Sequence, residues 1–113
     1  NRGSAAVSRA DRTALRAAYQ ARLDQAQNGA DRIYSAARII SSQLEKLQEQ
    51  TSDMKALASS AEEHYRNGTM SAGAFVGLET ALLKDEEESI RLRAALDSAR
   101  LELDLLLGLP FQP

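Results

Sequence analysis

An apolar stripe with alternating spacings of three and four residues runs through the first half of the chain. A seven-residue apolar repeat stays on one face of an α-helix only if the helix supercoils around a partner. The sequence therefore predicts an all-α protein built on a long coiled-coil helix. The stripe comprises Leu23, Ala26, Ala30, Ile33, Ala37, Ile40, Leu44, Leu47, Thr51, Met54, Ala58, Ala61 and Tyr65.

The composition fits narrow seams between helices better than a thick globular core. Of the 113 residues, 43% are hydrophobic but only 4% are aromatic, and there is no Trp. The formal net charge of −2, with both signs interspersed, argues against a nucleic-acid partner. No apolar run reaches the roughly 18–20 residues that span a bilayer, and the absence of cysteine excludes disulfides and thiolate metal sites.

The chain is predicted to reverse direction once, within residues 62–73. Asn67 and Gly68 are residue types that accept the left-handed conformation at a helix end, and Thr69 or Ser71 offers an oxygen to cap the next helix. We predict a first helix over about residues 8–67, a tip turn over about 67–71 and a second helix over about 72–107.

Two signals bear on the ends and the continuity of these helices. Ser8 to Asp11 has the spacing of a capping box, and Gly108 with Pro110 would stop the second helix. Gly29 is the weak link of the first helix, costing roughly 1 kcal/mol relative to Ala. Because the alternating spacing of the stripe continues unchanged past Gly29, we expect a continuous helix there, with a break as the alternative.

The second helix carries its own apolar seam, in which Asp85 and Ser89 occupy two heptad positions. Lys55 on the first helix is the expected partner of Asp85, which we interpret as a register device. The apolar members are Phe75, Leu78, Leu82, Leu92, Leu96, Ala99, Leu103 and Leu106.

Folding the two helices about the tip defines an antiparallel register. It sets Leu92 opposite residues 46–47, Ala99 near Ile40, and Leu106 near Ile33. Residues before about 30 then have no partner within the chain, although Leu15, Tyr19 and Leu23 give them an apolar side. We interpret residues 1–113 as a single helical-hairpin segment and an excerpt of a larger assembly.

No motif in the sequence points to catalysis or to a cofactor. The acidic run 84–88 reads best as a solvated helix face, because consecutive helical residues point around the helix. His64 is the only histidine, which is too few for a His-rich metal site, and we interpret it as a polar residue at a helix end. We therefore expect no enzyme activity, no metal site and no cofactor.

Several features follow one another along the sequence from the predicted turn onwards: the stretch Tyr65-Arg66-Asn67-Gly68-Thr69-Met70-Ser71, then Phe75, Leu78, residues 79–83, Ala95, Ala99 and residues 103–108. Together they resemble the outer-membrane efflux protein family, the TolC-like channels. In that family a Tyr-x-x-Gly turn precedes a Leu-rich helix that ends in a Leu-x-x-Leu-Gly-like sequence. The resemblance covers mainly residues 55–110, and the first helix agrees in pattern only.

The resemblance implies a homotrimeric outer-membrane conduit whose hairpins form a periplasmic α-barrel. It implies docking of the tips to a periplasmic adaptor protein, also called a membrane fusion protein, and through it to an inner-membrane pump. Carried over by position, Asn67, Gly68, Thr69 and Met70 would form the docking tip, with Tyr65 packing beside it. Some members narrow the pore with aspartates shortly after the turn, where this chain has Ala74 and Gly77.

Two further hypotheses remain beside the export channel. A coiled-coil scaffold or assembly subunit without a transport role would use the same heptads, and periodicity does not separate the two. A carboxylate-rich metal-binding bundle would predict stabilisation by divalent ions. Away from a barrel, we expect the segment to bury its apolar seams by self-association, as a homodimer that forms a helical bundle.

Overall fold

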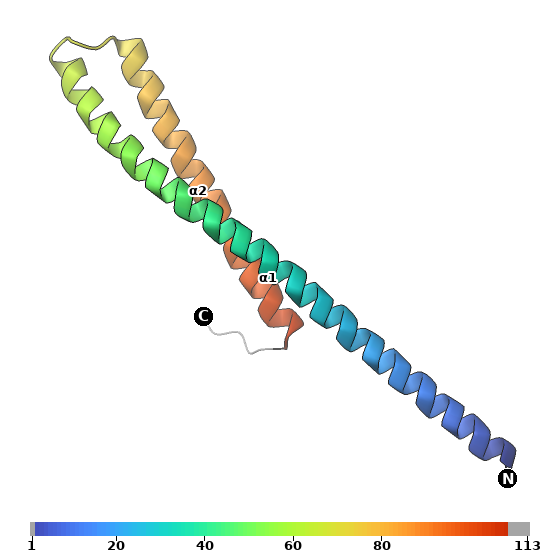
Figure 1. Ribbon diagram of the computed structural model, residues 1–113. Coiled ribbons are helices and arrows are strands. Elements are labelled where there is room, and N and C mark those ends of the chain that lie inside the picture. The colour runs from blue at the N-terminus through green and yellow to red at the C-terminus, as the bar shows by residue number, and fades with distance from the viewer. Residues whose placement is uncertain (1, 109–113) are drawn as a thin grey trace.

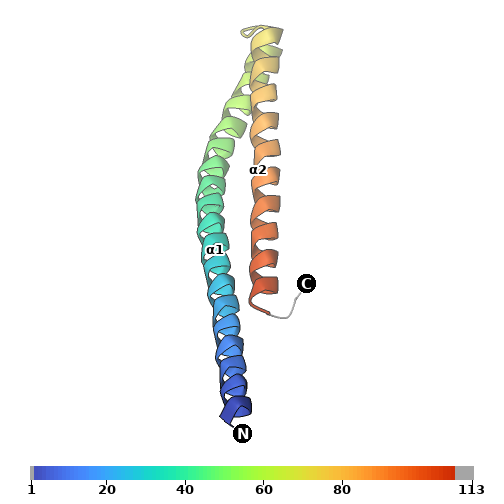
Figure 2. The ribbon, with the colours of Figure 1, turned by 90° about the vertical axis from the view of Figure 1, so that its right-hand side faces the viewer.

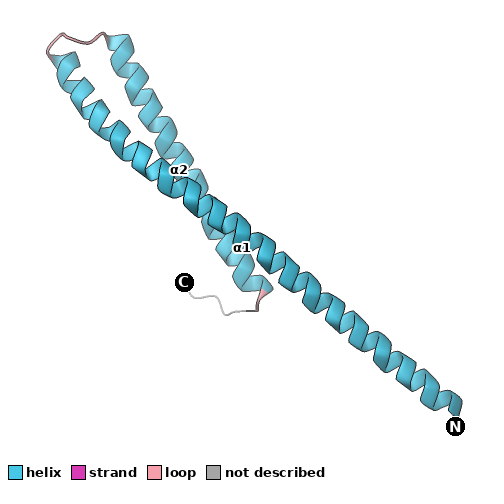
Figure 3. Ribbon diagram, in the orientation of Figure 1, coloured by secondary structure: helices cyan, strands magenta, loops and turns pink. Residues whose placement is uncertain are grey.

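The computed structural model describes residues 2–108, which form two helices joined by one turn (Figure 1). Helix α1 spans Arg2–Arg66 and helix α2 spans Ala72–Leu106. The described residues contain no strand (Figure 3). The two helices run antiparallel and contact each other, which confirms the predicted all-α helical hairpin.

The hairpin is a long and narrow rod. Its principal extents are 98 × 24 × 16 Å, and the 65 residues of α1 account for this length at about 1.5 Å per residue. α1 crosses α2 in the view of Figure 1 and curves beside it in Figure 2, as in a coiled coil.

The buried and half-buried side chains of α1 in the hairpin are mainly those of the apolar stripe predicted from the sequence. Ala30, Leu44, Thr51, Ala58 and Ala61 are buried, and the stripe members between them are half-buried. The facing seam of α2 is half-buried from Phe75 to Leu103, with Leu96 buried. Among the described residues no large side chain is completely buried, so the contact is a thin seam.

At the open end of the hairpin, Gly29 lies directly against Leu106. A Cβ atom built on Gly29 would lie 3.2 Å from Leu106 Cδ2, so the missing side chain lets α2 end close against α1. Leu106 therefore lies at Gly29, one helical turn from the Ile33 neighbour expected from the sequence. The helix passes through Gly29 without a break.

Residues 2–25 of α1 extend beyond the end of α2. All of them are exposed, including Leu15 and Tyr19, which is 66% exposed. Leu23 and Leu106, both expected in the seam, are also exposed. Both residues are exposed because a seam requires two facing helices, and α2 ends at this level.

The helix boundaries differ from the expected ones mainly at the start. α1 begins at Arg2 rather than near Ser8, so the Ser8 to Asp11 spacing lies inside the helix and does not mark its first turn. At the other ends, α1 stops at Arg66 and α2 at Leu106, each one residue before the expected limit. Pro110, expected to prevent continuation of α2, lies outside the described residues.

Replacing Gly29 by Ala tests whether this glycine is kept for packing or only tolerated. Ala gains about 1 kcal/mol of helix propensity over Gly. The new methyl group meets only the end of the Leu106 side chain, which is 39% exposed and able to move. We expect Gly29→Ala to raise the free energy of unfolding by about 0.5–1 kcal/mol, measured by urea denaturation.

The control is Gly29→Leu, whose bulk must displace α2 at this level and should lower the midpoint. A loss of stability in Gly29→Ala as large as that in Gly29→Leu would show that Leu106 does not yield.

Candidate docking tip

The end of α1 is closed by a complete Schellman motif. The Thr69 N–H donates to the His64 carbonyl at 2.8 Å, and the Gly68 N–H donates to the Tyr65 carbonyl at 3.1 Å. Gly68 has φ of +75°, the left-handed conformation that the motif requires and that a side chain disfavours. The expected role of the Asn67-Gly68 pair is therefore performed by Gly68.

The Thr69 side chain ties the turn back onto α1. Its hydroxyl donates to the His64 carbonyl at 3.0 Å and lies 3.0 Å from His64 Nδ1. Because the single hydroxyl proton goes to the carbonyl, His64 Nδ1–H is the donor in the second bond. The histidine thus serves as a polar contact at the helix end, and Thr69 does not cap α2.

Ser71 caps the start of α2. It has extended backbone angles, φ −72° and ψ 153°, and its Oγ accepts from the Ala74 N–H at 3.2 Å. Of the two capping candidates in the sequence, the structure selects Ser71. Five residues, 67–71, therefore suffice to end one helix and begin the next.

An aromatic stack closes the hairpin immediately below the turn. The rings of Tyr65 and Phe75 are 4.9 Å apart between centroids and inclined by 9°. One ring comes from the last turn of α1 and the other from the first turn of α2. The stack therefore holds the two helix ends at a fixed separation, next to the closely packed Ala61, which is 2% exposed.

The residues assigned to docking gather at this end of the rod. Asn67, Gly68 and Thr69 are exposed, Met70 is half-buried, and Tyr65 is 44% exposed outside its stack. They project at the apex of a hairpin whose backbone is fixed by the two caps. The arrangement provides a small exposed surface on a rigid support, with no titratable side chain in residues 67–71.

The positions where some channel proteins carry gating aspartates lie in the first turns of α2. Ala74 and Gly77 are both exposed, and a Cβ on Gly77 would meet no atom within 4 Å. Neither residue offers a charge or a ligand. This hairpin has no acidic constriction at those positions.

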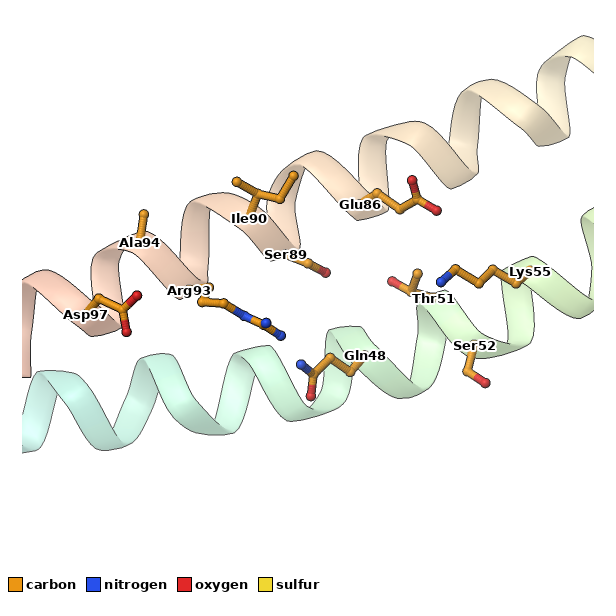
Figure 4. Close-up of a pocket in the computed structure, with 10 residues that line it drawn as sticks. All are labelled: Gln48, Thr51, Ser52, Lys55, Glu86, Ser89, Ile90, Arg93, Ala94 and Asp97. Atoms are coloured by element: carbon orange, nitrogen blue, oxygen red, sulfur yellow. The ribbon is translucent and has the colours of Figure 1, made fainter. Parts of the chain in front are cut away.

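A polar layer interrupts the seam halfway along the hairpin (Figure 4). The Thr51 hydroxyl donates to the Leu47 carbonyl at 2.8 Å, and the Ser89 hydroxyl donates to the Asp85 carbonyl at 3.0 Å. Both bonds stay within their own helix. Across residues 2–108, no side-chain hydrogen bond or ion pair links α1 to α2.

Asp85 lies in this layer without the partner expected for it. Its Oδ2 is buried and has no hydrogen bond, and the two ion pairs formed within the described residues join other groups. Lys55 instead lines a groove of about 650 Å³ beside the layer, together with Glu86 and Arg93. The expected Asp85–Lys55 pair is therefore wrong, because Lys55 extends along the edge of the seam.

Two ion pairs form on the surface of the described residues, each within a single helix. Arg66 bonds Glu62 at 2.7 Å and Arg91 bonds Glu88 at 3.0 Å, with all four side chains well exposed. Such pairs contribute about 0.3–0.5 kcal/mol each.

Within residues 2–108, no group of three acidic, histidine or cysteine side chains lies close enough together to hold a metal ion. Neither helix, over the same residues, is long and apolar enough to cross a bilayer.

Comparison of the chain with protein families, with curated proteins and with solved structures gave no match.

Replacing Gly68 by Ala isolates the conformational demand of the turn. No atom lies within 4 Å of a Cβ at this position, so the cost comes from the positive φ alone. We expect the free energy of unfolding to fall by about 1–2 kcal/mol. Chemical denaturation followed by circular dichroism measures the change.

Gly77→Ala is the matched control, since it adds the same methyl group in open space on an ordinary helical residue. It should be stabilising by up to about 1 kcal/mol. Equal effects of the two substitutions would refute the assignment of strain to Gly68.

Replacing Asp85 by Leu tests the cost of the unpaired carboxylate. The substitution removes a buried oxygen without a partner and restores an apolar heptad position. We expect stabilisation of about 1–2 kcal/mol, seen as a higher urea midpoint. Ser89→Leu is the comparison, because the Ser89 hydroxyl is already satisfied and its removal should gain less.

Proposed function

We propose that this chain is a periplasmic hairpin of a trimeric outer-membrane efflux or secretion channel, and that its tip docks a periplasmic adaptor protein. The observation that carries the proposal is the doubly capped turn, which presents residues 67–70 at the apex of the 98 Å rod. The sequence resemblance around this turn supplies the class of protein.

In this role the hairpin acts mechanically rather than catalytically. The seam and the Tyr65–Phe75 stack keep the rod stiff up to its apex. A displacement imposed at one end would then be transmitted to the tip with little internal bending. Movement of neighbouring tips past one another would open the conduit, and the adaptor would link that movement to an inner-membrane pump.

A partner would recognise the shape of the docking surface more than its charge. Residues 67–70 carry no formal charge, so a partner would recognise the path of the backbone, the Asn67 amide, the Thr69 hydroxyl and the Met70 thioether. A flexible, polarisable Met side chain is suited to such adaptable contacts. This makes the left-handed residue at the centre of the turn the most sensitive position.

The second candidate is a coiled-coil scaffold or assembly subunit without a transport role. One observation favours the scaffold role: all of residues 2–25 are exposed. An amphipathic helix of this length needs a further helix to cover Leu15 and Tyr19. The sequence that flanks this segment in its parent gene separates the two. Amphipathic β-strands with a second hairpin indicate a channel, whereas continued heptads indicate a scaffold.

Binding of a periplasmic adaptor tests the proposal directly. Gly68→Val places a β-branched residue at positive φ and should distort residues 67–70. We expect the affinity for an adaptor purified from the same organism to fall by about tenfold or more, measured by biolayer interferometry. Gly77→Ala, outside the turn, should bind as the unaltered chain does.

Retention of full affinity by Gly68→Val, with its helical content intact, would contradict docking through the tip. The absence of binding to any periplasmic adaptor would count against the channel role itself.

A further inference from the structure

α2 carries a second apolar stripe on the side opposite its seam. At 3.6 residues per turn, the stripe falls within about 60° of the helix surface. All its members are exposed, Ile90 to 71%, and Figure 4 shows Ile90 and Ala94 pointing away from α1. We call these residues the outer stripe: Val76, Leu83, Ile90, Ala94, Leu101 and Leu105.

A row of charges borders the outer stripe along one edge. Glu79, Glu86, Arg93 and Arg100 follow one another at intervals of seven residues, so they lie in one line along α2. The two acids are nearer the tip and the two bases are nearer the open end. Such a row is complementary to itself when a second copy runs in the opposite direction.

We propose that two copies of this chain form an antiparallel dimer through their outer stripes, about a two-fold axis between residues 88 and 89. In this register Glu86 faces Arg93 of the second copy, and Glu79 faces its Arg100. Charged positions that flank a coiled-coil seam set orientation and partner choice in this manner.

Two layers of the same register pair apolar residues of compatible size. Val76 meets Leu101 of the second copy, and Leu83 meets its Ala94, so larger residues face smaller or similar ones across the interface. The outer stripe also borders the groove of about 650 Å³ beside the polar layer, which Ile90 and Ala94 help to line. The second copy's α2 would cover that groove.

The acidic residues near the outer stripe exclude the competing arrangements. A parallel pair in register would set Glu87 against Glu87 and Asp97 against Asp97 of the second copy. An antiparallel pair shifted by one heptad would set Glu87 against Asp97 in one direction, and Glu86 against Glu86 of the charge row in the other. The proposed register places Glu87 against Ile90 and Asp97 against Thr80, so no two acids meet in the apolar layers.

The opposite edge of the interface is less favourable but remains neutralised. Lys84 approaches Arg91 of the second copy there, and Arg91 is already bound by Glu88 of its own helix at 3.0 Å. The two tips point to opposite ends of the dimer. Dimerisation uses the outer stripe of α2 and not residues 67–70, so the proposal does not depend on the proposed channel role.

Charge reversal in the intact 113-residue chain tests both the contact and its direction. Sedimentation equilibrium should show a dimer. Glu86→Arg and Arg93→Glu, each alone, create two like-charge pairs and should raise the dissociation constant by about tenfold. The double variant Glu86→Arg/Arg93→Glu should restore it, because the reversed pairs are again opposite in sign.

Two apolar variants test the stripe itself. Leu83→Lys should raise the dissociation constant by at least about a hundredfold, and it should leave the helical content unchanged because Leu83 is exposed in the hairpin. Ile39→Lys is the matched control, since Ile39 is equally exposed but lies on α1. It should dimerise as the unaltered chain does.

Three results would overturn the proposal. A chain that stays monomeric at all concentrations has no such interface. A double charge reversal that fails to restore dimerisation excludes this antiparallel register. A dimer that survives Leu83→Lys but is lost on Tyr19→Lys forms through residues 2–25 instead. Each result is independent of adaptor binding, so it leaves the proposed tip function unaffected.

Discussion

The packing of one apolar stripe against another holds this molecule together. Within residues 2–108 no side-chain hydrogen bond or ion pair crosses from α1 to α2, and the surface ion pairs stay within single helices. Small residues allow close packing along the contact: Ala58 and Ala61 are buried, and Gly29 beside the stripe receives the Leu106 side chain. A seam of this kind distributes stability along its whole length, and it extends only as far as both helices are present.

The turn depends on the seam in a specific way. Two caps decide where the helices end, through backbone bonds to His64 and Tyr65 and through the Ser71 hydroxyl. These bonds alone would leave the approach angle of α2 open. The Tyr65–Phe75 stack and the buried Ala61 fix it, so a short and uncharged surface is presented on a rigid support. That combination makes the apex a better candidate for recognition than the groove beside the polar layer.

The two faces of α2 serve different partners. The inner face buries its apolar residues against α1, whereas the outer stripe stays in water. A helix that is apolar on opposite sides is suited to lie between two neighbours. In the proposed channel these neighbours would be other hairpins of the barrel, and in the proposed dimer a second copy would be one of them. The charge row from Glu79 to Arg100 decides which direction that copy takes.

The heptad spacing and the Asn67-Gly68 signal were enough to predict the hairpin, because helical periodicity and turn chemistry are local properties of a sequence. The seven-residue spacing of Val76, Leu83 and Ile90 can also be read from the sequence. It indicates a second interface only once the opposite face of α2 is known to pack against α1. Tertiary structure alone decided that Gly29 receives Leu106, that Lys55 misses Asp85, and that Thr69 turns back to His64. These outcomes depend on distances between segments far apart in the chain or across a turn, which residue spacing does not specify.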